Sequence, residues 1–192
     1  MLTSGRQTKP ADRYEETAMK FFNKVLLSAV ALGAFASPAF AQASASQSTT
    51  STTRIIQPIT LTKNTDLAFG TYVRPTTGTN TLTIDATTGA RASTGGGDAA
   101  IVTASTSGRA TFTVGGEGAQ TFSITVPATM SMTSGANTIT VNLTASGATG
   151  TLSGTIGSAG SATFGVGGNY TVASSQASGS YTGSFTTTVA YN

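Results

Sequence analysis

The sequence predicts an all-β protein whose fold is an antiparallel β-sandwich. Three observations support this prediction: apolar and polar side chains alternate in several short runs, glycine-rich segments separate these runs, and no stretch after residue 41 shows a helical period. Alternation with a period of two is typical of strands that bury one face. Short strands at intervals of about ten residues indicate a sandwich or a barrel, and of the two we expect the sandwich.

Ahead of the predicted strands, residues 19–41 have the three parts of a secretory signal peptide. Two lysines precede an uncharged, mainly apolar run over residues 25–36, and small residues then occupy positions −3 and −1 of a cleavage site. The apolar run is shorter than the roughly 20 residues that a bilayer-spanning helix needs. We therefore predict cleavage between Ala41 and Gln42, export through the periplasm to the cell surface or medium, and no permanent membrane anchor.

Residues 1–18 are polar and charged and show no apolar period. A signal peptide normally begins at the N-terminus of its chain. We therefore interpret Met19 as the true start and residues 1–18 as a mis-called upstream extension. The alternative is that these residues form an unusually long n-region.

Removal of 41 of the 192 residues leaves 151, enough for one domain that buries roughly two-thirds of its unfolded surface. This part carries five basic and four acidic residues, so its net charge is +1, and its basic residues are not clustered. We expect no nucleic-acid partner, because such proteins concentrate basic residues on one face. The chain has no cysteine, so its stability must come from packing and sheet hydrogen bonds.

Several runs after residue 54 show the strand pattern most clearly, with β-branched and aromatic residues on one side and mostly Thr or Ser on the other. These runs are Thr81–Asp85, Arg109–Val114, Thr121–Val126 and Thr138–Thr144. Glycine clusters at 95–97, 115–118 and 167–169 separate the runs, and we interpret them as tight turns. The predicted sandwich domain covers residues 54–192.

The side chains that carry most enzyme chemistry are scarce. Without His or Cys the chain cannot form a Ser-His-Asp or Cys-His arrangement, nor the commoner zinc and copper sites. Its acidic residues after position 41 are Asp66, Asp85, Asp98 and Glu117, and most lie beside turn signals, where carboxylates are ordinarily solvated. They lack the ligand spacing of a calcium loop. We therefore expect no enzyme activity, no cofactor and no metal.

Both ends of the domain carry more specific motifs. Near the front, PITLTK at 58–63 precedes DLAFGTY at 66–72, and the chain closes with GSYTGSFTTTVAYN at 179–192. Over roughly residues 55–192 the sequence resembles a bacterial family known as domain of unknown function 4402. It is more distantly similar to spore coat protein U and the archaic chaperone–usher pilins. It departs from many of these in lacking cysteines near the first strand.

The pilin resemblance implies an immunoglobulin-like sandwich that lacks one strand. A periplasmic chaperone, and later the N-terminal arm of the next subunit at an outer-membrane usher, would supply that strand by β-augmentation. The C-terminal strand would line the acceptor groove, with Gly183 leaving space between two aromatics. The residues concerned are Tyr181, Gly183, Phe185, Val189 and Tyr191. An ordinary core strand has the same pattern.

The donor strand is harder to assign. Residues 42–53 are small and polar, and they are either a flexible spacer or an arm that orders on pairing. The better apolar donors are Ile55, Ile59 and Leu61, which share one parity, yet the same segment is the natural first strand of the domain. Two functions stay open: a pilin-like or adhesive surface subunit joined by strand addition, and a stand-alone secreted sandwich with a coat or binding role.

Overall fold

The computed structural model describes residues 44–192. The chain divides into two units, residues 1–52 and 53–192. In the first unit, the described residues 44–52 form no helix or strand and their side chains are exposed. The interpretations of residues 1–18, of the signal peptide and of the cleavage site at Ala41 and Gln42 lie outside the described residues. No helix within residues 44–192 is long and apolar enough to cross a membrane.

The second unit is built from strands alone over its described residues. Their bounds are β1 (Thr60–Thr65), β2 (Tyr72–Val73), β3 (Thr79–Ile84), β4 (Arg91–Gly95), β5 (Ala100–Ile101), β6 (Ala110–Glu117), β7 (Thr121–Thr125), β8 (Thr129–Ser134), β9 (Asn137–Ala145), β10 (Thr149–Thr151), β11 (Ala159–Ala173) and β12 (Thr188–Tyr191). Every pairing between these strands is antiparallel.

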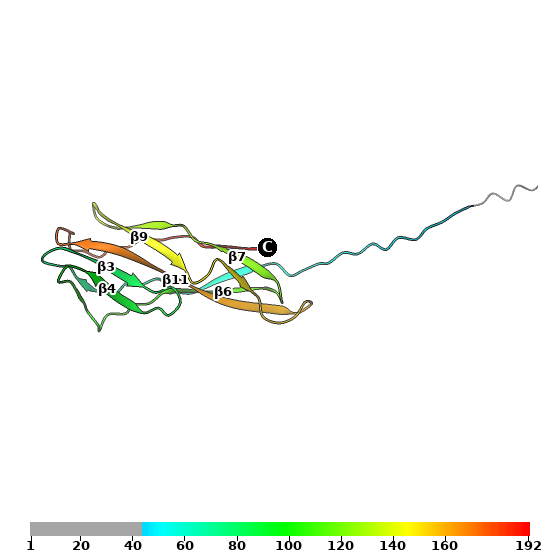
Figure 1. Cartoon of the computed structure of the whole chain (residues 1–192), viewed down its shortest axis with the longest axis horizontal. Helices are drawn as coiled ribbons and strands as arrows, with labels where there is room; N and C mark the ends of the chain where they lie inside the picture. Colours follow the sequence, from blue (N-terminus) through cyan, green and yellow to red (C-terminus); the bar gives the residue numbers. More distant parts are fainter. Residues whose placement is uncertain (1–43) are drawn as a thin grey trace, which may run out of the picture. The chain divides into compact units, whose positions relative to one another are not determined.

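The longest strand, β11, organises the larger sheet. Its first half pairs with β6 and its second half with β3, giving the order β1-β6-β11-β3-β4. Residues 166–169 of β11 also pair with β9, which in turn pairs with β8. A smaller sheet has the order β10-β7-β12. Figure 1 shows β11 extending through this unit, from β6 at one end to β3 and β4 at the other.

The core lies where apolar side chains from these strands meet. Leu82, Val114, Val141 and Val166 are fully buried, and Phe122 of the smaller sheet belongs to the same apolar cluster. All four of the alternating runs that the sequence singles out form strands, namely β3, β6, β7 and β9. The predicted antiparallel β-sandwich is therefore confirmed.

Two glycine clusters are not the turns that the sequence predicts. Gly167 lies inside β11 and Gly116 inside β6. A Cβ atom at Gly167 would collide with the backbone of Ile84 and Ala86, and one at Gly116 would collide with the hydroxyl of Tyr191. Glycine is needed at these positions because neighbouring segments approach the strands closely, which is a recognised role of glycine within sheets.

Candidate functional site: the C-terminal edge

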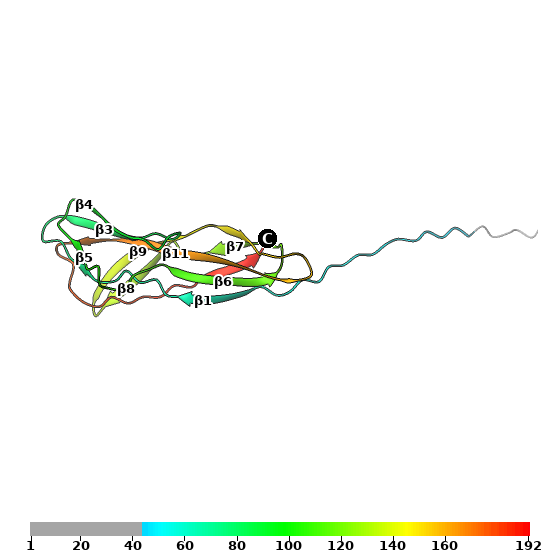
Figure 2. The same ribbon diagram turned by 90° about the horizontal axis from the view of Figure 1, so that it is seen from below.

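The C-terminal strand β12 is the edge of the smaller sheet. It pairs with β7 from Thr188 opposite Thr125 to Tyr191 opposite Phe122. No other strand among the described residues pairs with β12, so one of its sides has no ladder of hydrogen bonds. β12 also contacts β1, which is itself the edge strand of the larger sheet, but the two strands do not pair. Figure 2 shows β1 beside β6, with the red C-terminal strand next to them.

Residues 183–187, which lead into β12, are not a strand. The sequence predicts a C-terminal strand over 179–192, but the structure forms β12 only at Thr188–Tyr191, with an isolated bridge between Thr133 and Thr182. Between these points, no backbone hydrogen bond joins residues 183–187 to another described residue. We call residues 183–191 the C-terminal edge. Its first part has an unpaired backbone, although its side chains keep the alternation that predicted a strand.

The apolar side chains of this edge point toward the domain core. Phe185, Val189 and Tyr191 are half-buried and pack against the core cluster, as does Tyr181 just ahead of the edge. Ser184 and Thr186 between them are exposed. The Thr187 hydroxyl is buried and has no hydrogen-bond partner among the described residues. The edge therefore combines an apolar inner face with unsatisfied polar groups.

Gly183 has a different neighbour from the one that the sequence indicates. A Cβ atom there would collide with the carbonyl oxygen of Ser131 and press on the Met132 side chain. The space that this glycine leaves is therefore taken by the backbone of β8, not shared between two aromatic rings. The expectation about Gly183 was wrong because sequence spacing cannot identify the facing strand.

Tyr191 connects the C-terminal edge to the start of the domain. Its hydroxyl accepts a hydrogen bond from the backbone N–H of Glu117 at 2.7 Å and donates one to the carbonyl of Gln57 at 2.9 Å. Residues of β12, of the end of β6 and of the segment before β1 thus meet at one phenol. Residues ahead of Gln57 lie upstream of this attachment point.

Glu117 is a site residue that sequence reasoning missed. It was expected to be a solvated turn residue, yet it is 3% exposed. Its carboxylate accepts hydrogen bonds from the backbone N–H of Gly157 at 2.5 Å and of Gln57 at 3.3 Å. These donors, that of Gly157 first, lower the pKa of Glu117 below its ordinary value because they favour the charged form. The glycines beside Glu117 gave no signal of its burial.

The donor residues that the sequence proposes lie in different environments. Ile55 is 91% exposed, whereas Ile59 and Leu61 are half-buried and pack on the core. Leu61 belongs to β1, where it pairs with Val114 of the same domain. The structure therefore does not bring these three residues onto one free face, and only Ile55 is available to a partner.

Asp85 and Asp98 each bind backbone groups of a loop, whereas Asp66 forms an exposed ion pair with Lys63. Asp85 accepts hydrogen bonds from the N–H groups of Thr87 and Thr88, and Asp98 from the side chain and N–H of Thr76. These bonds lower the pKa of both aspartates. Within residues 44–192 no three His, Cys, Asp or Glu side chains gather as metal ligands.

A family comparison agrees with the motifs at the two ends of the domain. The model of the family described as Domain of unknown function (DUF4402) matches residues 59–191, from just before β1 to the end of β12. Neither the search of curated proteins nor the search of solved structures found a match. The match covers more than half of the chain and includes the whole C-terminal edge, and on this basis the chain belongs to the DUF4402 family.

Proposed function

We propose that this protein is an exported, non-enzymatic structural subunit of the cell surface, and that copies join by strand addition at the C-terminal edge. The observation that carries the proposal is the unpaired backbone of residues 183–187, continued by the free side of β12. An exposed sheet edge presents N–H and C=O groups that pair readily with another extended chain. Here the half-buried Phe185 and Val189 would add apolar contacts beneath the incoming strand.

The donor in this proposal is the segment ahead of Gln57 from a second copy. Residues 44–56 form no strand, and Ile55 and Ile56 are the large apolar residues exposed within them. Leu61 and Ile59 are excluded as donors because their own domain already uses them. Gln57, held by Glu117 and Tyr191, would mark the point where the donor segment ends and the domain begins.

The affinity of this donor would come mainly from backbone hydrogen bonds. The segment offers few apolar side chains besides Ile55 and Ile56, and most of its residues are Ser, Thr, Ala or Gln. A periplasmic chaperone would cover the C-terminal edge before assembly. At an outer-membrane usher, the donor segment of the next subunit would then replace the chaperone. These partners follow from the pilin resemblance and are part of the proposal.

Electron microscopy of surface-sheared material tests the proposal. Cells producing the intact protein should yield filaments that disappear when the gene is deleted. They should also disappear when residues 42–56 alone are removed, because the donor segment is then missing while all twelve described strands and the bonds of Gln57 to Glu117 and Tyr191 are kept. The matched control replaces residues 44–50 with a Gly-Ser segment of equal length, which keeps Ile55 and should keep the filaments.

The alternative is a stand-alone secreted sandwich with a coat or binding role. It predicts a soluble monomer, recovered in equal yield with and without residues 42–56. Recovery of that monomer without filaments in any strain would contradict the strand-addition proposal.

A further inference from the structure

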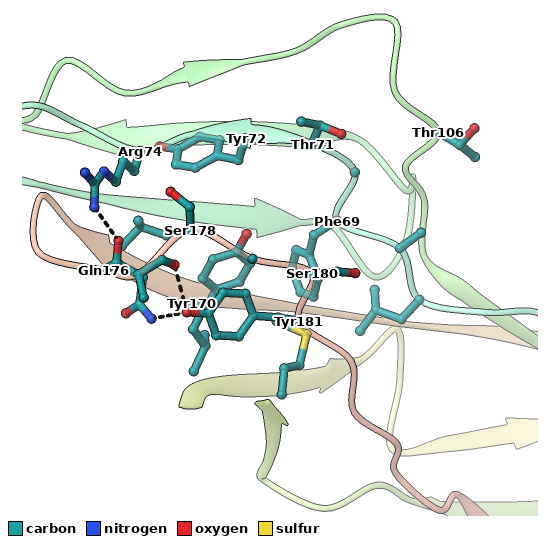
Figure 3. A pocket seen from close by; sticks show the side chains of 18 residues that line it. Phe69, Thr71, Tyr72, Arg74, Thr106, Tyr170, Gln176, Ser178, Ser180 and Tyr181 are labelled. Atoms are coloured by element: carbon teal, nitrogen blue, oxygen red, sulfur yellow. Dashed lines mark hydrogen bonds between the residues drawn. The ribbon is translucent and has the colours of Figure 1, made fainter. Parts of the chain in front are cut away.

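A pocket of about 610 Å³, shown in Figure 3, is lined by no residue of β12. Most of its lining comes from residues 67–72 and 74, the second half of β11, and the loop at residues 176–181; Thr106, Met132 and Ile139 complete it. No residue of the C-terminal edge lines the pocket, although Tyr181 just ahead of that edge does. The pocket can therefore be tested separately from the proposed assembly.

The lining of the pocket is aromatic and rich in hydroxyl groups. Phe69, Tyr72, Tyr170 and Tyr181 supply four rings, and several Ser and Thr side chains surround them. Arg74 is the charged residue in the lining, and none of the carboxylates within residues 44–192 joins it. Rings beside hydroxyl groups suit a ligand that has both C–H faces and polar groups, while the uncompensated arginine favours a negative charge.

Tyr170 is largely buried, but its hydroxyl is not among the buried atoms that lack a hydrogen-bond partner. Its side chain is 7% exposed, and its ring meets that of Phe69 edge-on, with centroids 4.9 Å apart. The hydroxyls of Tyr72 and Tyr181 bond to Ser93 and Ala177, but that of Tyr170 has no partner among the described residues. Figure 3 shows it pointing toward the side of the pocket near Tyr72 and Ser178.

The hydroxyl of Tyr170 can donate a hydrogen bond to an oxygen atom of a ligand in the pocket. Asn80 and Thr187, not Tyr170, carry the polar side-chain atoms of the described residues that are both buried and unpaired, so the Tyr170 hydroxyl is accessible from the pocket. Burial, with the nearby Tyr72, raises the pKa of Tyr170 to about 12, so it stays protonated.

Arg74 completes the site. Its guanidinium donates one hydrogen bond to the carbonyl of Gln176 at 2.8 Å, which holds the side chain at the rim of the pocket. The group carries five N–H donors, and its planar fork matches a carboxylate with two parallel hydrogen bonds. It can therefore receive an acidic group of a ligand while it remains attached to the loop.

We propose that this pocket binds an acidic saccharide, a sugar ring that carries a carboxylate. The carboxylate pairs with Arg74, a ring hydroxyl or the ring oxygen accepts a hydrogen bond from Tyr170, and the C–H face of the sugar contacts Tyr72 or Tyr181. The sequence contains no Trp, the residue most associated with sugar stacking, but these tyrosines provide aromatic surface in its place.

The test is a titration of the isotope-labelled protein with D-glucuronic acid, followed by the NMR shifts of its backbone amides. D-Glucose is the matched neutral ligand. We expect saturable shifts at Gly70, Thr71 and Ser178, with glucuronate binding at least tenfold more tightly than glucose. Tyr170→Phe should weaken glucuronate binding about three- to tenfold. Arg74→Gln should remove the preference for glucuronate over glucose, because the charge-assisted pair is lost.

The control variant is Arg54→Gln, which removes one positive charge from an exposed position outside the pocket. It should bind glucuronate as the unmodified protein does. The proposal is overturned if glucuronate shifts no amide of the pocket, or if Arg74→Gln and Tyr170→Phe bind it as tightly as the control. Equal affinity for glucose and glucuronate would likewise overturn the assignment of an acidic ligand.

Discussion

Removal of the Tyr191 hydroxyl should destabilise the domain by a predictable amount. In Tyr191→Phe the ring still packs on the core, but the N–H of Glu117 loses its 2.7 Å partner. Glu117 is 3% exposed, so water cannot easily replace that partner, and an unsatisfied buried N–H costs about 1–3 kcal/mol. The carbonyl of Gln57 also loses a hydrogen bond, but it lies at an exposed position where water can take over.

For a domain of this size, a loss of about 2 kcal/mol lowers the melting temperature by roughly 4–8 °C. Differential scanning calorimetry of Tyr191→Phe and of the unmodified protein measures this difference in melting temperature. The matched control is Tyr72→Phe, whose hydroxyl bonds to the rotatable hydroxyl of Ser93 and so leaves a partner that can turn elsewhere. The reasoning is refuted if Tyr191→Phe melts no lower than Tyr72→Phe.

Three further predictions follow from the same region. The lowered pKa of Glu117 means that its ionised form stabilises the fold above about pH 4.5, and that this contribution is lost as the pH falls through the lowered value. The urea midpoint of Glu117→Gln should therefore fall less between pH 7 and pH 3 than that of the unmodified protein, and equal slopes would count against the assignment. Gly183→Ala should lower the free energy of unfolding by about 1–3 kcal/mol, because the new methyl group meets Ser131. Gly108→Ala, where a Cβ meets nothing within 4 Å, is its control in urea unfolding, and equal losses in the two variants would contradict the account. Ile55→Asp should leave the melting temperature unchanged, since Ile55 is 91% exposed, yet prevent filament formation; a lowered melting temperature would show that Ile55 belongs to its own domain.

The sequence predicted the fold class because alternation records which side chains face the core. Phe112, Val141 and Leu82 alternate with polar neighbours, and all three are buried in strands. The same signal is interrupted in β11: Phe164, Val166, Tyr170 and Val172 are buried, but Gly168 stands between them because the backbone of β9 comes close to it. Composition alone therefore suggested a turn in the middle of the longest strand.

The sequence predicted only part of the candidate site, because alternation indicates the direction of side chains and not the pairing of the backbone. Alternation over residues 181–191 correctly places Phe185 and Val189 against the core, yet it cannot report whether the backbone has a partner. That partner must come from elsewhere in the chain or from another molecule. The burial of Glu117 was likewise invisible, because it depends on Gln57, Gly157 and Tyr191 meeting from distant positions.

Cysteine cross-linking tests the proposed strand addition most directly, because the chain has no cysteine of its own. If Ile55 points into the acceptor domain, Arg54 points outward, on the same side as the exposed edge residues Ser184, Thr186 and Thr188. Paired strands lie about 4.8 Å apart, within the Cα separation that a disulfide spans. Arg54→Cys should be combined in turn with a cysteine at each of those three positions.

At least one of these pairs should give a ladder of disulfide-linked multimers on non-reducing gels of surface material. Arg54→Cys combined with Thr103→Cys, at an exposed loop position away from the edge, should give none. Multimers confined to the edge pairs are the result that strand addition predicts. The absence of a ladder from all three edge pairs, or an equal ladder from the Thr103 control, would contradict it.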